Sequence, residues 1–187
     1  MKMEKTLLVL AVLALSGCAA MSEAECRTGD WYGVGERDGR GGSGSRLGDY
    51  ADACRKAGVL PDPAEYSRGR ERGLRTYCTP ENGYRVGISG ESYQSVCTPE
   101  TQAGFLREYE RGRARYELRR DLDALREDFS RWDRENSRLN DLIGKTNNEE
   151  ERRRYMQQRD ANERNRRDGR IRQLILETRW NLLPNEY

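Results

Sequence analysis

Residues 65–78 read Glu-Tyr-Ser-Arg-Gly-Arg-Glu-Arg-Gly-Leu-Arg-Thr-Tyr-Cys, and this stretch decides how the chain folds. On a helix, Gly69 and Gly73 lie four residues apart and share a face with Tyr66. A glycine inside a helix costs about 1 kcal/mol relative to alanine. Two of them therefore indicate that another backbone packs closely against this face. The helix that carries Gly112 is the expected neighbour, and a ligand lying over the glycine face is the alternative.

The same pattern occurs a second time, 43 residues further along the chain. The identical pairs are Gly44/Gly87, Tyr50/Tyr93, Cys54/Cys97, Glu65/Glu108, Tyr66/Tyr109, Arg68/Arg111, Gly69/Gly112, Arg70/Arg113 and Arg72/Arg115. Two repeats are too few for a solenoid. We therefore expect two related halves that pack together. Each would hold a turn-rich lead-in, a cysteine-bearing helix and a Tyr-x-x-Gly helix.

The segments around these repeats predict further short elements. Residues 46–57 and 63–77 predict helices, separated by Gly58 and a proline-rich turn. The glycine-rich residues 33–39 superficially resemble a phosphate-binding loop, but they lack its Gly-Lys-Ser/Thr ending. We expect a structural loop there.

A short β-hairpin is expected between the helices, in residues 82–93. The pair Asn82-Gly83 is typical of a hairpin turn. The apolar residues Tyr84, Val86 and Ile88 then alternate along the chain, as they do in a strand.

The sequence after residue 105 has a heptad pattern. Residues at alternating spacings of four and three form a mostly apolar stripe: Leu118, Leu122, Leu125, Phe129, Trp132, Asn136, Leu139 and Ile143. Residues 144–148 break this helix, and a second helix to about residue 182 is expected to fold back as a coiled-coil hairpin. Its facing stripe is polar in the middle, so Phe129 and Trp132 would meet arginine stems and Asn162. A homodimer or partner helix through 118–143, or a single charged helix, stays open.

The composition limits the chemistry that the chain can perform. Of the 187 residues, 35% are hydrophobic and 35% are charged, and the formal net charge is only +2. The sequence contains no histidine, which disfavours Ser-His-Asp or Cys-His catalysis and histidine-based metal sites. Because the arginines alternate with carboxylates, we expect no nucleic-acid partner. No cofactor is expected.

The N-terminus predicts a secreted and lipid-anchored protein. Lys2 and Lys5 precede the apolar residues 7–15, as in a signal peptide. The following Ser-Gly-Cys, ending at Cys18, looks like a bacterial lipobox, which implies cleavage before this cysteine and its acylation. Ala19 then suggests sorting to the outer membrane. An ordinary signal peptide is the alternative.

The other four cysteines predict two disulfides. Cys26, Cys54, Cys78 and Cys97 are even in number and would lie in an oxidising compartment. Their wide spacing is unlike that of a zinc site, so no metal is expected. The ends of an antiparallel helix pair would keep Cys54 far from Cys78, which disfavours a bond between these two. Of the two remaining pairings we prefer Cys26–Cys54 with Cys78–Cys97. Cys26–Cys78 with Cys54–Cys97 is the second possibility.

The spaced cysteine, glycine and tyrosine residues resemble a family of bacterial lipoproteins, domain of unknown function family 2799. The residues that carry the resemblance are Cys26, Asp30-Trp31, Gly35, Asp38-Gly39, Cys54, Tyr66, Gly69, Gly73-Leu74, Tyr77-Cys78, Gly87, Gly90, Tyr93 and Cys97. It covers about residues 18–115. It implies an envelope lipoprotein but brings no activity and no catalytic residues.

The expected fold is mainly α, a small disulfide-stapled helical module with short β-hairpin or turn segments followed by the long charged hairpin. The expected parts are a signal peptide (1–17), a lipidated N-terminus and linker (18–25), the cysteine-rich module (26–104), the helical hairpin (105–183) and a tail (184–187).

These features predict a non-enzymatic lipoprotein on the periplasmic side of the outer membrane. It would act as a structural or protein-interaction module toward an envelope protein or peptidoglycan. The alternative is a glycan- or small-ligand-binding module, with Asp30, Trp31, Asp38 and Tyr84 forming a cleft. For Trp31 a place in the core beside Cys26 is favoured. A carboxylate-based glycan hydrolase is the third hypothesis.

Overall fold

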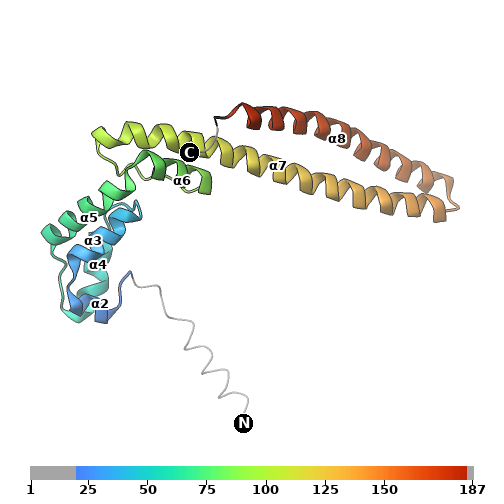
Figure 1. Ribbon diagram of the computed structural model, residues 1–187. Helices are drawn as coiled ribbons and strands as arrows, with labels where there is room; N and C mark the ends of the chain where they lie inside the picture. The colour runs from blue at the N-terminus through green and yellow to red at the C-terminus, as the bar shows by residue number, and fades with distance from the viewer. Residues whose placement is uncertain (1–19, 185–187) are drawn as a thin grey trace, which may run out of the picture. The chain divides into compact units, whose positions relative to one another are not determined.

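The computed structural model describes residues 20–184, and these are mainly helical (Figure 1). The helices are α2 (Glu23–Thr28), α3 (Trp31–Arg40), α4 (Leu47–Cys54), the 3-10 helix η2 (Arg55–Ala57), α5 (Pro63–Tyr77), α6 (Pro80–Ser89), α7 (Pro99–Lys145) and α8 (Glu149–Leu182). The mainly α prediction is confirmed. The predicted signal peptide and the lipid-attachment residue Cys18 lie outside the described residues.

Two sequence predictions about local structure were wrong. Residues 20–184 contain no strand, and the expected β-hairpin segment instead forms α6. Pro80 favours a helix at this point because its fixed φ suits the first helical position. The expected loop at residues 33–39 lies within α3, whose start is capped by the side chain of Asp30. Both helices contain glycines that disfavour a helix locally, so contacts with other helices must supply the stability.

The chain divides into two compact units. In its described part, the first unit comprises residues 20–79 and Tyr93–Gln102, and the second comprises Pro80–Ser92 and residues 103–184. Helix α7 is continuous from Pro99 onward and contributes its first residues to the first unit.

A small core and two disulfides hold the first unit together. Its buried cluster consists of Met21, Cys26, Trp31, Val34, Tyr50, Cys54 and Tyr66. Disulfides join Cys26 to Cys54 and Cys78 to Cys97, with Cα atoms 5.5 and 5.6 Å apart. This is the preferred of the three possible pairings. In the chain-entropy model, loops of these lengths stabilise the fold by about 3–4 kcal/mol each.

Helices α3 and α5 of this unit cross in backbone contact. A Cβ atom placed on Gly35 or Gly39 of α3 would lie under 3.0 Å from a carbonyl oxygen of α5, and the same holds for Gly69 and Gly73 against α3. The close approach expected from Gly69 and Gly73 is therefore real. The expected neighbour was wrong, because these glycines face α3 and not the helix with Gly112.

The second unit repeats this crossing with α6 and the start of α7. Gly83 and Gly87 of α6 lie against the carbonyl oxygens of Phe105 and Tyr109, and Gly112 lies against that of Tyr84. Tyr109 and Gly112 are thus the counterparts of Tyr66 and Gly69.

The repeat unit is a glycine-crossed helix pair. The second helices of the two pairs, α5 and α7, are related by the 43-residue shift found in the sequence. The first helices, α3 and α6, are related by a longer shift. The contact of Gly35 with the carbonyl group of Tyr66 corresponds to the contact of Gly87 with the carbonyl group of Tyr109. A cysteine-bearing helix is not repeated, because α4 ends at Cys54 whereas Cys97 lies in a non-helical segment before α7.

The rest of α7 and the whole of α8 form a long extension of the second unit. We call α7 from residue 117 onward together with α8 the arm. Thr146, Asn147 and Asn148 separate the two helices, and the Asn148 side chain accepts hydrogen bonds from the backbone N–H groups of Glu150 and Glu151. Helix α8 runs back along α7 (Figure 1). No helix among residues 20–184 is both long enough and apolar enough to cross a membrane.

Candidate functional site

Two residues of the predicted ligand cleft have structural roles in the first unit. The Asp30 carboxylate caps α3 by accepting a hydrogen bond from the backbone N–H of Gly33 at 2.8 Å. Trp31 is buried in the core cluster with Cys26, as the favoured interpretation of this residue expected. Neither side chain presents the stacking face or the free carboxylate that a sugar-binding cleft requires.

Asp38 lies at the centre of a buried hydrogen-bond network. Its side chain is in α3 and only 8% of the residue is exposed. The Tyr50 hydroxyl donates to this carboxylate at 2.9 Å, and the Tyr66 hydroxyl donates to it at 2.7 Å. The Tyr66 oxygen in turn accepts a hydrogen bond from the backbone N–H of Arg46 at 3.0 Å. The network therefore ties α3, α4 and α5 together.

Burial keeps both tyrosines of this network neutral. It raises the pKa of Tyr50 to about 12, with the hydrogen bond to Asp38 adding to the effect. Burial is also the main cause that raises the pKa of Tyr66. A neutral hydroxyl is the form that can donate to a carboxylate. Asp38 thus acts as an acceptor inside the fold and not as a group that faces a ligand.

Tyr84, the fourth predicted cleft residue, belongs to the second unit. It is in α6, half-buried, and the guanidinium of Arg111 on α7 lies 6.0 Å from its ring centroid. The Tyr84 carbonyl oxygen is also the atom against which Gly112 packs. Within each unit, the cleft residues are used for packing and capping.

The aromatic pair of the arm packs on a glycine. Phe129 and Trp132 of α7 meet edge to face, with ring centroids 5.6 Å apart. A Cβ atom on Gly169 of α8 would lie 3.1 Å from an atom of each ring. The expected neighbours of these rings were arginine stems and Asn162. The missing side chain of Gly169 provides the space that the rings fill instead.

A polar network explains why the middle of the α8 seam is not apolar. Buried Asn136 of α7 donates from Nδ2 to Oε1 of Glu163 on α8 at 2.7 Å. Arg166 of α8 pairs with both Glu163 and Asp133, at 3.0 and 2.9 Å. Asn136 is buried, whereas the side chains of Arg166, Glu163 and Asp133 are partly exposed. A polar group buried between paired helices can fix their register, because a shift would separate Asn136 from Glu163.

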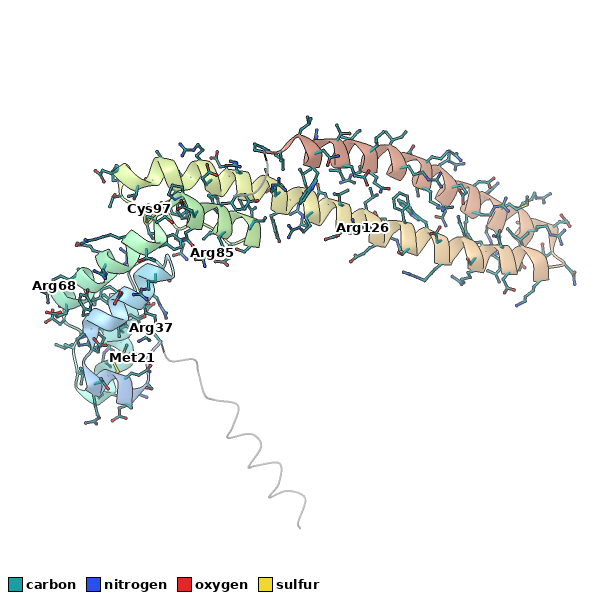
Figure 2. The ribbon with its side chains drawn as sticks, viewed as in Figure 1. Met21, Arg37, Arg68, Arg85, Cys97 and Arg126 are labelled. Atoms are coloured by element: carbon teal, nitrogen blue, oxygen red, sulfur yellow. A yellow bond between two sulfur atoms is a disulfide. The ribbon has the colours of Figure 1, made fainter. Side chains whose placement is uncertain are left out.

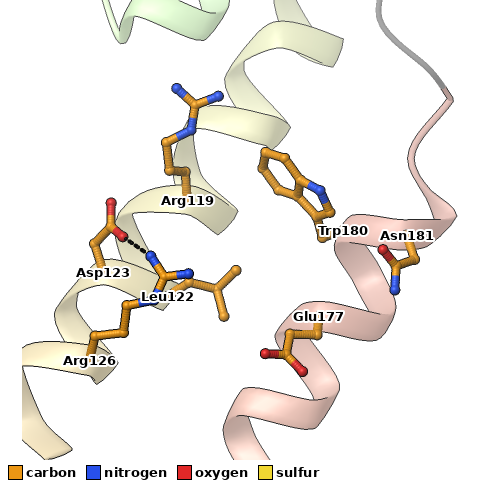
Figure 3. Close-up of a pocket in the computed structure, with 7 residues that line it drawn as sticks. All are labelled: Arg119, Leu122, Asp123, Arg126, Glu177, Trp180 and Asn181. Carbon is orange, nitrogen blue, oxygen red and sulfur yellow. Dashed lines mark hydrogen bonds and ion pairs between the residues drawn. The ribbon is translucent and has the colours of Figure 1, made fainter.

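An open groove lies between α7 and α8 near the C-terminal end of α8 (Figure 3). It has a volume of 590 Å³ and is lined by Arg119, Leu122, Asp123, Arg126, Glu177, Trp180 and Asn181.

Trp180 dominates one wall of this groove. The guanidinium groups of Arg115 and Arg119 lie 5.0 and 5.8 Å from its ring centroid. Arg115 also donates to the carbonyl oxygen of Pro184 at 2.8 Å, which holds Pro184 near the indole. Asp123 and Arg126 pair with each other on the opposite wall at 2.6 Å. An aromatic face among charges of both signs suits a peptide or a sugar ring, and the lining contains no nucleophile with an adjacent base.

The outer face of α8 carries a row of exposed apolar side chains that the sequence analysis missed. Ile171, Leu174, Ile175 and Leu182 are 62%, 65%, 49% and 78% exposed. We call these four residues the α8 ridge. Their spacing of three, four and eleven residues from Ile171 could have revealed a second apolar face, because Gly169, Leu176 and Trp180 occupy the face toward α7.

Charged groups cover most of the remaining arm surface (Figure 2). Most of the ion pairs join residues three or four positions apart, such as Arg131 with Asp128 and Lys145 with Asp141. Within residues 20–184, no group of three or more cysteine or acidic side chains is placed to hold a metal ion.

Comparison with known proteins finds a family model that matches part of the chain. Residues 30–114 match the family described as "Protein of unknown function (DUF2799)", which confirms the resemblance predicted from the sequence. The matched segment contains α3, α5, α6 and the start of α7 up to just beyond Gly112. It therefore includes both glycine-crossed helix pairs, whereas α8 and most of α7 lie outside it. No curated protein and no solved structure matches the chain.

Proposed function

We propose that this chain, whose residues 30–114 match a family of unknown function, is a lipid-anchored lipoprotein of the bacterial envelope. It would face the periplasm from the outer membrane and act as a non-enzymatic structural or protein-interaction module. The lipobox-like sequence that ends at Cys18 supports the anchor. The disulfides Cys26–Cys54 and Cys78–Cys97 support an oxidising compartment, where such bonds persist.

The arm is the part of the molecule that we assign to interaction. If α7 and α8 form a coiled-coil hairpin, the apolar stripe of residues 118–143 packs against α8. The burial of Leu125 and Leu139 supports this arrangement. A homodimer or partner helix on that stripe would have to displace α8. The groove beside Trp180 remains open for a segment of an envelope protein. This groove is the observation that carries the proposal of an interaction module.

In-cell crosslinking tests the partner proposal directly. A photo-crosslinking residue replaces Asn181 in the groove, and a matched control replaces the exposed Glu127 on α7. We expect Asn181 to capture an envelope protein that Glu127 does not capture. Equal labelling at both positions, or labelling of no protein at either, contradicts the proposal.

Glycan or peptidoglycan binding is the second candidate function. The residues that line the groove favour it there, and not at the cleft predicted from the sequence. The Trp180 ring could stack on a sugar, with Asn181 and Glu177 near its hydroxyl groups. Pull-down on purified peptidoglycan separates the two candidates. Binding that is lost in Asn181→Ala and kept in Glu127→Ala supports glycan recognition, whereas no binding by the parent protein excludes it.

A further inference from the structure

We propose that the outer face of the C-terminal half of α8 docks on an anionic lipid surface. This inference goes beyond the anchoring described above and rests on it only for the proximity of the arm to a membrane. Two independent observations carry it, the α8 ridge and a set of arginines around the ridge that lack acidic partners.

The α8 ridge has the geometry of an interfacial helix. At 100° per residue, Ile171, Leu174, Ile175 and Leu182 fall within a sector of about 100°. The twelve residues from 171 to 182 extend for about 18 Å along the helix. The opposite side of α8 is occupied by α7, which contacts Gly169 and Trp180. A flat surface can therefore contact the ridge without disturbing the arm.

The charge beside the ridge is positive on balance, and its arginines are unpaired within the described residues. The exposed arginines of residues 164–182 are Arg164, Arg167, Arg170, Arg172 and Arg179. None of these five makes an ion pair within the described part of the chain, and only Asp168 and Glu177 oppose them in the same segment. Elsewhere in the arm, arginines pair with carboxylates, as Arg126 does with Asp123.

A helix with exposed apolar residues on one face and arginines along its flanks is typical of one that lies in a membrane interface. Each arginine near an anionic headgroup region strengthens binding about five-fold. The ridge side chains would enter the acyl boundary, and the long arginine side chains would reach the phosphates.

A second copy of the chain fits this face less well. Two ridges facing each other would bring the arginines of both copies together across one interface. The four ridge residues are also few beside the roughly 20–30 residues per partner in a stable interface. An acidic protein remains as an outcome of the test below.

The test follows the environment of the ridge in the full acylated protein. Leu174 is replaced by cysteine and labelled with an environment-sensitive fluorophore, and a matched control carries the label at exposed Gln157 on the same helix. The protein is reconstituted in phosphatidylcholine vesicles with or without one third phosphatidylglycerol. We expect a blue-shifted, lipid-quenchable emission at position 174 only in the anionic vesicles, and no shift at position 157.

Charge variants give the size of the effect. Arg172→Gln with Arg179→Gln lowers the ratio of docked to free arm about 25-fold, because each arginine accounts for about five-fold. Arg134→Gln with Arg153→Gln removes the same charge from exposed positions outside the ridge and leaves the ratio unchanged. High salt also releases the arm, since screening weakens the attraction.

Three results overturn the inference. The first is an unchanged emission at position 174 in all pure lipid vesicles. If native envelope membranes nevertheless shift this emission, the ridge binds a protein and not a lipid surface. The second is a shift in neutral vesicles that grows with protein density, which assigns it to a second copy. The third is an equal loss of docking in the two double variants. A wrong anchor assignment would be recognised separately, because Cys18 would be unacylated and the protein would not float with vesicles. In that case, the ridge is still tested by mixing the labelled protein with vesicles.

Discussion

Replacing Gly112 by alanine tests the glycine-crossed helix pair of the second unit. A Cβ atom at this position would lie 2.7 Å from the backbone N of Ile88 and also under 3.0 Å from the carbonyl oxygen of Tyr84. Because both atoms are backbone, no side chain can rotate away, and α6 must move off α7. Because two backbone atoms are in the way, the cost lies in the upper part of the usual over-packing range, at about 2–3 kcal/mol, against a gain of about 1 kcal/mol in helix propensity. We expect a net loss of about 1–2 kcal/mol.

The same helix offers a matched control at Gly104. A Cβ atom there would meet only the Cγ of Pro80 at 3.5 Å, an ordinary contact. Gly104→Ala should therefore stabilise α7 by up to about 1 kcal/mol through helix propensity alone. Identical substitutions in one helix thus have effects of opposite sign.

Urea denaturation followed by helical circular dichroism measures both variants. With a slope of about 2 kcal/mol per molar urea, Gly112→Ala should lower the midpoint of the second unit by roughly 0.5–1 M. Gly104→Ala should raise it. If both substitutions raise the midpoint, the backbone contact at Gly112 does not exist and the repeat has been misinterpreted.

Three further predictions follow from other parts of the structure. Burial raises the pKa of Tyr50 from 10.0 to about 12. The contribution of neutral Tyr50 to stability is therefore complete below pH 10 and is lost as the pH rises toward 12. Unfolding curves measured at alkaline pH should show this loss of stability, and the loss should be smaller in Tyr50→Phe. Gly169→Leu should lower the thermal midpoint of the arm by the equivalent of about 1–3 kcal/mol, because the new side chain must displace Phe129, whereas an unchanged midpoint refutes the packing of the aromatic rings. Removing the disulfide by Cys26→Ala with Cys54→Ala should destabilise the first unit by about 3–4 kcal/mol, and urea curves identical to those of the parent protein would show that this bond is absent.

Sequence reasoning succeeded where local signals and long-range constraints agreed. The helix predicted over residues 63–77 is α5, because Asp62 caps it and Pro63 suits its first position. The helix break predicted at 144–148 falls where α7 ends at Lys145 and α8 begins at Glu149. The preferred disulfide pairing also forms, although the distance argument along the helices excluded only a Cys54–Cys78 bond and left two pairings open.

The failures at α3 and α6 share one physical cause. Their glycines lower helix propensity locally, so the sequence was interpreted as a loop and a strand. In the folded chain, the glycines allow backbone contact with α5 and α7, and that packing outweighs propensity. The signal was present in the pairs Gly35/Gly39 and Gly83/Gly87, which have the same four-residue spacing as Gly69/Gly73.

The candidate surfaces were harder to predict than the fold. The predicted cleft residues Trp31 and Asp38 are a core side chain and the acceptor of a buried network, which composition and spacing do not reveal. The groove beside Trp180 depends on which helix faces meet, and no local pattern marks it. The α8 ridge could have been found by testing every face of the second helix for apolar spacing.

The central claim is that the mature protein begins at an acylated Cys18 in an oxidising compartment. Mass spectrometry of protein purified from bacterial membranes under thiol-blocking conditions tests both parts of this claim in one measurement. We expect an N-terminal peptide with fatty acyl groups on Cys18 and disulfide-linked peptides joining Cys26 to Cys54 and Cys78 to Cys97. A different, unmodified N-terminus together with four blocked free thiols would contradict it.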